Sequence, residues 1–416
     1  MNLNALKPVA EKIFEDIRVL SWDGVGVTRA SYGPGETATA AYLRRFAESH
    51  GLVVSTDAAA NLLFRQPSLA PDARAVWTGS HLDSVPRGGN FDGLAGIVAG
   101  LLCLVAHQQA GTCIALCVIA FRGEESAWFG KAYMGSAAAF GLLSAHDLQL
   151  RHRSGDQTLG DYMAQAGADT LAVTSGRPLI DKALVAAYLE LHIEQGPVMV
   201  ARHLPLAVVS GIRGNVRHNR VRCIGEAGHS GAVPRWLRRD AMFAVADLIM
   251  RLDEHWRAML ERGMDLVVTT GIVSTDAAEH SISRIPGTVD FSFEARSRSQ
   301  DTLEAFHALM QAECDTIGQE RGVRFEFDRR LLSAPATMDD HVISVLSQAC
   351  TQQGVAFDVI ASGAGHDAAV LANAGIPSGM VFIRNANGSH NPNEAMDLDD
   401  FMPGVAVIAA AAKALA

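Results

Sequence analysis

The sequence has no long hydrophobic run. None of its 416 residues lies in an apolar stretch approaching the roughly 18 residues that a membrane-spanning helix needs. Residues 1–20 also lack the basic start, apolar centre and small-residue cleavage site of a signal peptide, and their spacing predicts an amphipathic helix instead. We therefore expect a protein with no membrane partner that resides in the cytoplasm.

Cysteine pairs are also missing, and dense basic sequence is confined to one stretch at 213–222. The six cysteines lie scattered in apolar or helical contexts without a Cys-x-x-Cys pair, which predicts reduced, buried thiols and neither disulfides nor a zinc ribbon. There are 35 Lys and Arg against 45 Asp and Glu, giving a net charge of -10. Because phosphate binding needs a concentrated basic surface, nucleic acid is not an expected partner.

The sequence does contain enough apolar residues for two domains. Its hydrophobic fraction of 49% is typical of a globular protein, and 416 residues exceed the usual size of one hydrophobic core. Short apolar runs at 75–81, 113–121 and 183–193 are typical of buried parallel strands, and 93–109 has the character of a buried helix. This strand-helix-strand order predicts an α/β domain.

A second pattern begins near residue 209. Alternating strands and periodic helices follow the order βαββαβ, which predicts a ferredoxin-like α+β domain with two helices on one face of an antiparallel sheet. The segments are 218–226, 237–260, 264–274, 285–297, 300–320 and 323–330. After residue 331 the α/β composition returns, so we expect a discontinuous α/β domain with a mixed sheet at 1–208 and 331–416. The second domain is inserted at 209–330.

Histidines and carboxylates occur where the apolar strands end. Ligand sites in open α/β sheets lie beyond the carboxyl ends of the strands, so these side chains are expected to meet at one edge. They are His81, Asp92, Glu124, Glu125, His192 and His390. Asp83 is placed to fix the tautomer of His81 through its second ring nitrogen. Adjacent carboxylates are alternatively typical of a solvated helix start, but three histidines with two carboxylates suffice for a two-metal site.

The motifs that carry these residues resemble a known family. In order, "GSHLDSVPRGGNFDG", "FRGEES", "ELHIEQGP", "GHSGAVP", "SGAGHDA" and "SHNPNE" are similar to motifs of the dimetal amidohydrolases of the M20 peptidase group. The most similar branch contains N-carbamoyl-L-amino acid hydrolases, allantoate amidohydrolases and β-ureidopropionases. The likeness extends from "GVTRASY" near residue 26 to "NPNE" at 394. It implies that the α/β domain is the catalytic dimetal domain and that the inserted domain is a lid that also forms a homodimer.

The resemblance assigns a role to each side chain at the strand ends. Asp92 would bridge two divalent ions, and Glu124 would be the general base. The metal ligands would be His81, Asp92, Glu125, His192 and His390. The ions expected are Zn²⁺ or Mn²⁺, with Co²⁺ or Ni²⁺ as alternatives. The resemblance also implies a cis peptide bond between Asp92 and Gly93.

Further side chains are placed around the substrate by the same resemblance. His229 would stabilise the oxyanion, reaching across the dimer. Gln195 and Arg296 would hold the substrate carboxylate, for which the planar fork of arginine is suited, although a strand-surface salt bridge is an alternative for Arg296. His366 would contact the substrate, with Asp367 as its supporting partner.

Two positions in the lid leave alternatives open. Asn215, in the basic stretch 213–222, either lies on a solvated strand face, which we favour, or contacts an anionic substrate or the partner subunit. Ser283 stands where the family usually has a substrate-contacting asparagine, which removes amide donors and leaves space.

The main hypothesis is a metal-dependent hydrolase of a linear C–N bond in a small anionic amide or ureide, an N-carbamoyl-L-amino acid above all. One alternative keeps the mechanism and changes the substrate to allantoate, another ureide or an aromatic amide. Another is a metal-binding paralogue without catalysis. A dipeptidase or aminoacylase of the M20 group fits less well, because "HIEQGP" and the third histidine match the carbamoylase branch.

Overall fold

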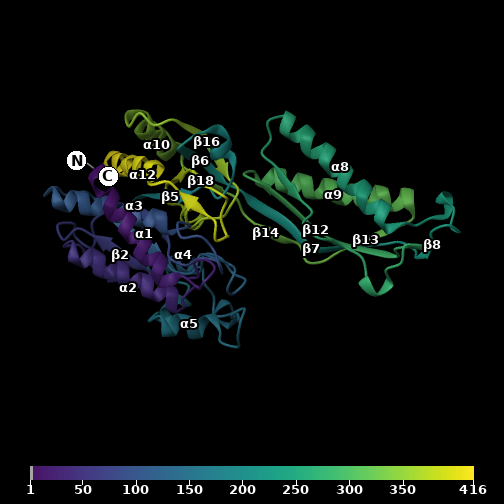
Figure 1. Cartoon of the computed structure of the whole chain (residues 1–416), viewed down its shortest axis with the longest axis horizontal. Helices are drawn as coiled ribbons and strands as arrows, with labels where there is room; N and C mark the ends of the chain where they lie inside the picture. Colours follow the sequence, from purple (N-terminus) through teal and green to yellow (C-terminus); the bar gives the residue numbers. More distant parts are fainter. Residues whose placement is uncertain (1–2) are drawn as a thin grey trace. The chain divides into compact units, whose positions relative to one another are not determined.

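The computed structural model describes residues 3–416, which form two compact units. One unit contains the chain up to Gly211 together with Thr337–Ala416, and the other contains Ile212–Ala336. Figure 1 shows both chain ends in the first unit and the helices α8 (Ala241–Glu261) and α9 (Gln300–Arg321) in the second. The predicted fold class is confirmed: an α/β unit with a mixed sheet and a separate unit with an antiparallel sheet.

The first unit is built on a nine-stranded sheet with the order β1-β2-β4-β3-β5-β17-β6-β15, and β16 pairs with β6. The strands are β1 (Val53–Thr56), β2 (Leu62–Arg65), β3 (Ala75–His81), β4 (Leu116–Phe121), β5 (Val185–Ile193), β6 (Leu206–Ile212), β15 (Ala336–Thr337), β16 (Phe357–Ser362) and β17 (Ser378–Ile383). The central strands β4, β3, β5 and β17 run parallel to one another. As the sequence predicted, the C-terminal segment completes this sheet, because β17 lies between β5 and β6.

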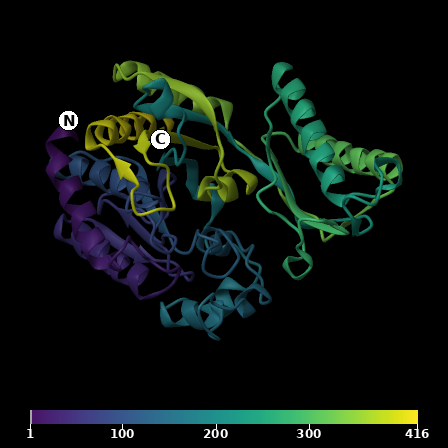
Figure 2. The ribbon, with the colours of Figure 1, turned by 45° about the vertical axis from the view of Figure 1, so that its right-hand side comes forward.

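Helix α3 (Leu94–Gln109) lies directly on this sheet, and every residue from its start to Ala106 is buried. A Cβ atom on Gly96 would lie 2.4 Å from the backbone oxygen of Leu191 on β5. Only glycine permits so close an approach between helix and strand. Helix α12 (Leu398–Leu415) packs against α3 and also contacts β5 and β17, so the two ends of the chain share one core (Figure 2).

The remaining elements of the first unit are helices around the sheet and one short hairpin. They are α1 (Lys7–Ser21), α2 (Pro34–Ser49), α4 (Met134–Ala139), α5 (Leu159–Gln165), α6 (Thr170–Val173), α7 (Val198–Arg202), α10 (Asp340–Gln352), α11 (Asp367–Asn373), β18 (Asn385–Ala386) and β19 (Ala395–Met396). Between residues 3 and 416, no helix combines the length and apolar character that crossing a membrane requires.

The second unit has an antiparallel sheet with the order β10-β12-β7-β13, to which β9 adds at β12 and β14 at β7. These strands are β7 (Gly214–Ile224), β9 (Val267–Thr269), β10 (Val273–Ser274), β12 (Thr288–Ser297), β13 (Arg324–Phe327) and β14 (Leu331–Ser333). Every second residue of β12 is buried, and these residues share a core with α8 and α9. A separate pair, β8 (Gly228–His229) and β11 (Arg284–Ile285), lies outside this sheet.

Two details differ from the sequence-based expectation. The single strand expected at 264–274 is two short strands, β9 and β10, which pair with different parts of β12 and are separated by a break that contains Gly271.

All six cysteines are free thiols, but Cys113 is exposed, because it lies in the loop that precedes β4 and not in the buried strand.

Candidate active site

The parallel strands bring the predicted metal ligands to one edge of the sheet. His81 is the last residue of β3, and His192 is the second-last residue of the neighbouring strand β5. Glu124 and Glu125 follow the end of β4, on the other side of β3. Because all three strands point the same way, their carboxyl ends present these side chains to the same space.

Asp92 lies at the centre of this group. Its Oδ1 atom is 3.2 Å from Nε2 of His192 and 3.5 Å from Nε2 of His81. Its Oδ2 atom is 3.4 Å from Nε2 of His390, which in turn lies 3.2 Å from Oε1 of Glu125. The structure therefore brings together all five predicted ligands, in two groups that share Asp92. Four of the five are buried, whereas the His390 side chain is 51% exposed.

The hydrogen bonds of His192 indicate that a cation fits between it and Asp92. Nδ1 of His192 lies 2.9 Å from the carbonyl oxygen of Ile193, which can only accept, so Nδ1 carries the proton. Nε2 then has a lone pair, and the backbone N–H of Gly93 donates to it at 3.2 Å. Oδ1 of Asp92 is buried and receives no hydrogen bond. Two acceptors that face each other repel unless a cation joins them, and imidazole nitrogen with carboxylate oxygen is a ligand set for divalent transition metals.

Asp83 connects the loops that follow β3 and β4. Its carboxylate lies 3.3 Å from Nδ1 of His81, and its backbone carbonyl oxygen lies 3.2 Å from the same nitrogen, while Nε2 of His81 faces Asp92. The same carboxylate accepts hydrogen bonds from the backbone N–H groups of Glu124, at 2.9 Å, and Glu125, at 3.0 Å. Burial raises the pKa of Asp83, but His81 and these donors outweigh burial and lower it below its ordinary value.

Gly93 allows the chain to turn beside the His81 ring. Its φ of +69° is in the left-handed region, and a Cβ atom there would lie 2.5 Å from the ring of His81. Glycine is therefore required at this position. The expectation of a cis peptide bond between Asp92 and Gly93 is wrong in this structure, which has a trans bond there.

Glu124 is buried at the edge of the same space. Burial raises its pKa well above the ordinary value, and the charge of neighbouring Glu125 adds to this effect against the opposing effect of His81. A carboxylate with a raised pKa accepts a proton more readily at neutral pH, which suits a general base. Glu125 instead points to His390.

Gln195 also lies at the site. Its Nε2 donates to Oδ2 of Asp92 at 2.8 Å, and its backbone N–H is held by Asn385 at 2.9 Å. Its backbone adopts φ of +63°, in the left-handed region. Gln195 is therefore fixed beside the shared carboxylate, where the resemblance places a substrate contact.

Sequence reasoning missed Glu190, which lies two residues before His192 on β5. Residues two apart on a strand face the same side, so the pattern "ELH" contained the signal. Glu190 accepts from Oγ of Ser80 at 2.6 Å and from the backbone N–H of Ala368 at 2.8 Å. It forms a third group of ligand atoms with His192 and His366. Because both of its oxygens already accept hydrogen bonds, Glu190 positions the strands and is a poorer candidate ligand than Asp92.

His366 and Asp367 lie beside Glu190. Nε2 of His366 is 2.8 Å from Oγ of Ser362, and burial together with His192 lowers its pKa well below the ordinary value. Asp367 accepts from Oγ of Ser136 at 2.5 Å, and burial raises its pKa to about 7. The structure thus brings both residues next to the candidate metal ligands without showing a substrate contact.

Glu394 and Ser389 were also missed. Glu394 accepts hydrogen bonds from the backbone N–H groups of Phe91, at 2.8 Å, and Asp92, at 3.3 Å. Oγ of Ser389 lies 2.7 Å from Oδ2 of Asp92 and 2.6 Å from Oε2 of Glu394. The motif "SHNPNE" signalled this segment, but only the fold shows that its glutamate fixes the Asp92 backbone.

One predicted catalytic residue and three predicted substrate-binding residues lie in the second unit, on or beside two pairs of neighbouring strands. The β8–β11 ladder places His229 opposite Arg284, and the N–H of Ser230 donates to the carbonyl oxygen of Ser283 at 2.8 Å. Arg296 on β12 lies opposite Asn215 on β7, and it forms an ion pair with Glu294 at 3.0 Å. The roles of His229, Ser283, Arg296 and Asn215 stay predictions.

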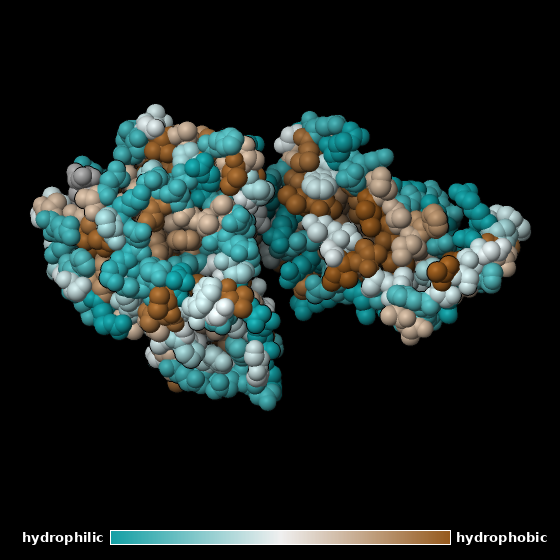
Figure 3. All heavy atoms as spheres, in the orientation of Figure 1, coloured by the Kyte–Doolittle hydropathy of each residue, from teal (hydrophilic) through white to brown (hydrophobic). Residues whose placement is uncertain are grey.

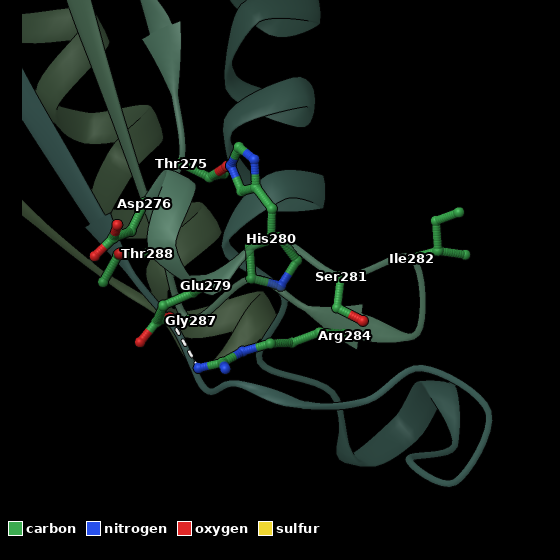
Figure 4. Close-up of a pocket in the computed structure, with 10 residues that line it drawn as sticks. Thr275, Asp276, Glu279, His280, Ser281, Ile282, Arg284, Gly287 and Thr288 are labelled. Carbon is green, nitrogen blue, oxygen red and sulfur yellow. Dashed lines mark hydrogen bonds and ion pairs between the residues drawn. The ribbon is translucent and has the colours of Figure 1, made fainter.

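The segment before β12 borders a cavity of about 420 Å³ in the second unit (Figure 4). Nε2 of His280 lies 2.6 Å from Oγ1 of Thr275, and Arg284 forms an ion pair with Glu279 at 2.9 Å. Ile282 is fully exposed and points away from these side chains. Side-chain contacts therefore hold this segment on both sides of its exposed tip.

Comparison with known proteins identifies the family. The family model described as peptidase family M20/M25/M40 matches residues 77–414. The chain belongs to this family. The M20 chain is 35% identical over 388 residues to an N-carbamoyl-L-amino acid amidohydrolase of Geobacillus stearothermophilus, covering 92% of each chain. It is 29% identical to the allantoate amidohydrolase of Escherichia coli, again covering 92% of each.

A solved structure agrees with this assignment. The amidase of the hydantoinase/carbamoylase family from Burkholderia multivorans superimposes with a TM-score of 0.89 and 25% identity, covering 99% of this chain and 98% of that one. The M20 chain is thus a metal-dependent amidohydrolase of the hydantoinase/carbamoylase branch that acts on C–N bonds.

Proposed function

We propose that this amidohydrolase cleaves the carbamoyl C–N bond of an N-carbamoyl-L-amino acid at the site around Asp92. The observation that carries the proposal is the arrangement of Asp92, whose two carboxylate oxygens face separate groups of ligand atoms. The donor set suits two Zn²⁺ or Mn²⁺ ions, and Co²⁺ or Ni²⁺ are compatible with it. The relative from Geobacillus stearothermophilus is named for this activity, which supports the choice of substrate.

The residues of the site divide the chemistry among them. His81, Asp92 and His192 would hold one ion, and Asp92, Glu125 and His390 would hold the other. Two divalent ions supply, when bound, Lewis acidity toward the substrate carbonyl and a lowered pKa for water. Glu124 accepts the proton of the attacking water and returns it to the departing nitrogen as the C–N bond breaks.

The unit at 212–336 serves as a lid in this proposal. Gln195 and Arg296 are the residues that we propose for the substrate carboxylate; in this structure Arg296 pairs with Glu294 and lies opposite Asn215 on the sheet. His229 donates a hydrogen bond to the developing oxyanion. His366 contacts the substrate, and Asp367 supports it.

A second substrate class is favoured by Ser283. A serine offers one hydroxyl where an asparagine offers an amide with two donors and one acceptor, so the headgroup contact is weaker and the space larger. Allantoate, another ureide or an aromatic amide therefore remains the alternative, with the same mechanism. The allantoate amidohydrolase of Escherichia coli is a relative of this chain.

A substrate screen tests these two alternatives. We expect the Mn²⁺- or Zn²⁺-loaded protein to release ammonia from N-carbamoyl-L-amino acids with a higher kcat/KM than from allantoate or ureidoglycolate. An ammonia-coupled assay with the D-enantiomer as control measures this directly. A kcat/KM that is higher for allantoate than for every carbamoyl amino acid would move the function to the second class.

The lid carries an apolar surface that suits a second copy of this chain. Trp236 is 81% exposed, and Phe243 and Met250 are 60% and 61% exposed. Phe243 and Met250 are seven residues apart on α8 and share one face of the helix. Figure 3 shows hydrophobic side chains gathered on the unit that contains α8. A patch of this kind marks an interface more often than free surface.

Charged substitutions on this surface should produce a monomer. We expect the double variant Trp236→Asp, Phe243→Asp to sediment as a monomer at micromolar concentration, whereas the wild type sediments as a dimer. Leu171→Asp is the matched control, because Leu171 is 84% exposed but lies in the first unit. If His229 acts across the dimer, the monomer also loses turnover. A monomeric wild type, or a dimeric double variant, would contradict the proposed interface.

A further inference from the structure

Arg29 lies in the motif "GVTRASY" (residues 26–32), and its guanidinium group is a buried cation that is not part of the candidate metal site. Its relative exposure is 0%. Its Nε donates to the carbonyl oxygen of Leu82 at 2.7 Å, and one terminal nitrogen donates to Oδ1 of Asn90 at 3.2 Å. The other terminal nitrogen is buried without a partner. Among residues 3–416, no carboxylate forms an ion pair with this guanidinium, which is unusual for a buried arginine.

The partners of Arg29 are the two ends of the loop that carries the shared ligand. Leu82 follows His81 directly, and Asn90 lies two residues before Asp92. The Arg29 backbone holds the same loop, because its N–H donates to Oγ of Ser84 and its carbonyl oxygen accepts from the N–H of Ser84, both at 2.9 Å. The span from His81 to Asp92 is therefore fixed to one side chain and its backbone.

The energetic role of Arg29 follows from its burial. A buried cation without an ion pair is costly, and here the charges that favour it are Glu394, Asp83 and Asp92. A hydrocarbon side chain of similar length would fill the space, but it would leave the carbonyl oxygen of Leu82 and the amide of Asn90 without a donor. Leaving such buried acceptors unpaired destabilises the loop that they belong to.

We infer that Arg29 is a positioning residue that holds His81 and Asp92 at the separation required to bind a cation between them. The inference rests on the proposed function, because it assumes that these two side chains are metal ligands. Side chains that orient metal ligands typically change metal affinity by about 10- to 100-fold when they are removed.

Charge and geometry make opposite predictions for Arg29. If only its charge mattered, removing the cation would relieve its repulsion of a metal ion, and Arg29→Met would bind metal more tightly. If it positions the loop, Arg29→Met binds more weakly despite that relief. Arg29→Lys keeps the charge but has no planar fork to bond Leu82 and Asn90 together, so it should lie between the wild type and Arg29→Met.

The experiment measures Zn²⁺ affinity of the full chain by competition with a chelator, together with Tm of the metal-free protein. We expect about 10- to 100-fold weaker Zn²⁺ binding in Arg29→Met and partial recovery in Arg29→Lys. Arg251→Met is the control: Arg251 of α8 forms ion pairs with Glu313 and Glu320 of α9, so its loss should lower Tm without changing Zn²⁺ affinity.

Unchanged or tighter Zn²⁺ binding in Arg29→Met would overturn the inference. If Arg29→Met does not fold, Asn90→Leu removes the acceptor at the other end of the contact and should weaken Zn²⁺ binding in the same direction. Unchanged affinity in that variant overturns the inference equally. A wild type that binds no Zn²⁺ would instead refute the proposed function, so the two failures are distinguishable.

Discussion

Replacing Asp92 with asparagine should remove the paired metal site and reduce hydrolysis to the background rate. Asparagine is nearly isosteric, but its amide nitrogen carries two hydrogens and no lone pair to share with a cation. Because Oδ1 and Oδ2 face different groups of ligands, one substitution disturbs both sites. The loss of metal affinity should exceed the roughly 10- to 100-fold that loss of a supporting residue causes.

Metal content after exhaustive dialysis, measured by mass spectrometry, checks this result. Asp358→Asn is the matched control, because Asp358 belongs to the same unit but forms a surface ion pair with Arg202. It should keep both metal content and turnover. If Asp92→Asn retained two ions per subunit and wild-type kcat, the assignment of Asp92 as the shared ligand would fail.

Replacing Glu124 with glutamine should lower kcat by about 10²- to 10⁴-fold, the usual contribution of a general acid–base residue. Glutamine has a similar shape and keeps the backbone hydrogen bond from residue 124 to Asp83, but it cannot accept the proton of water. We expect KM and metal content to change little, because none of the three groups of candidate metal ligands includes Glu124.

Glu125→Gln is the matched control for this second prediction. Glu125 is the neighbour of Glu124 and has the same chemistry, yet it faces His390 and Asp92. Its substitution should lower metal content, and added metal should restore part of the turnover. If Glu124→Gln lost metal while Glu125→Gln retained it, the roles of the two glutamates would be exchanged. Full activity in Glu124→Gln would remove it from the mechanism.

The meeting of His81, Glu125 and His192 could be predicted because each lies at or shortly after the end of a strand whose apolar pattern is local, whereas the ligand set with Asp92 and His390 came from the resemblance. His81 and His192 stand at the ends of continuous apolar runs, and such runs predict buried parallel strands. The parallel order then requires these ends to meet. The supporting residues were not predictable in the same way, since Glu394 contacts Asp92 across about 300 positions of sequence, and no periodicity reports such a contact.

The order of the elements and the insertion of one domain into the other could also be predicted from the sequence. The order βαββαβ followed from alternation and helical period, and the insertion followed from the return of α/β composition after it. The break between β9 and β10 was hidden, because Gly271 lies within an otherwise apolar stretch. The strands β1 and β2 have four residues each, which is too few to show a period, and their pairing with each other and of β2 with β4 stabilises them.

The measurement that tests the central claim most directly is anomalous diffraction at the manganese edge from crystals grown with Mn²⁺. We predict two peaks per subunit on either side of Asp92, one next to His81 and His192 and the other next to Glu125 and His390. A single peak among Glu190, His192 and His366, or ordered Mn²⁺ with none in contact with Asp92, would contradict this account.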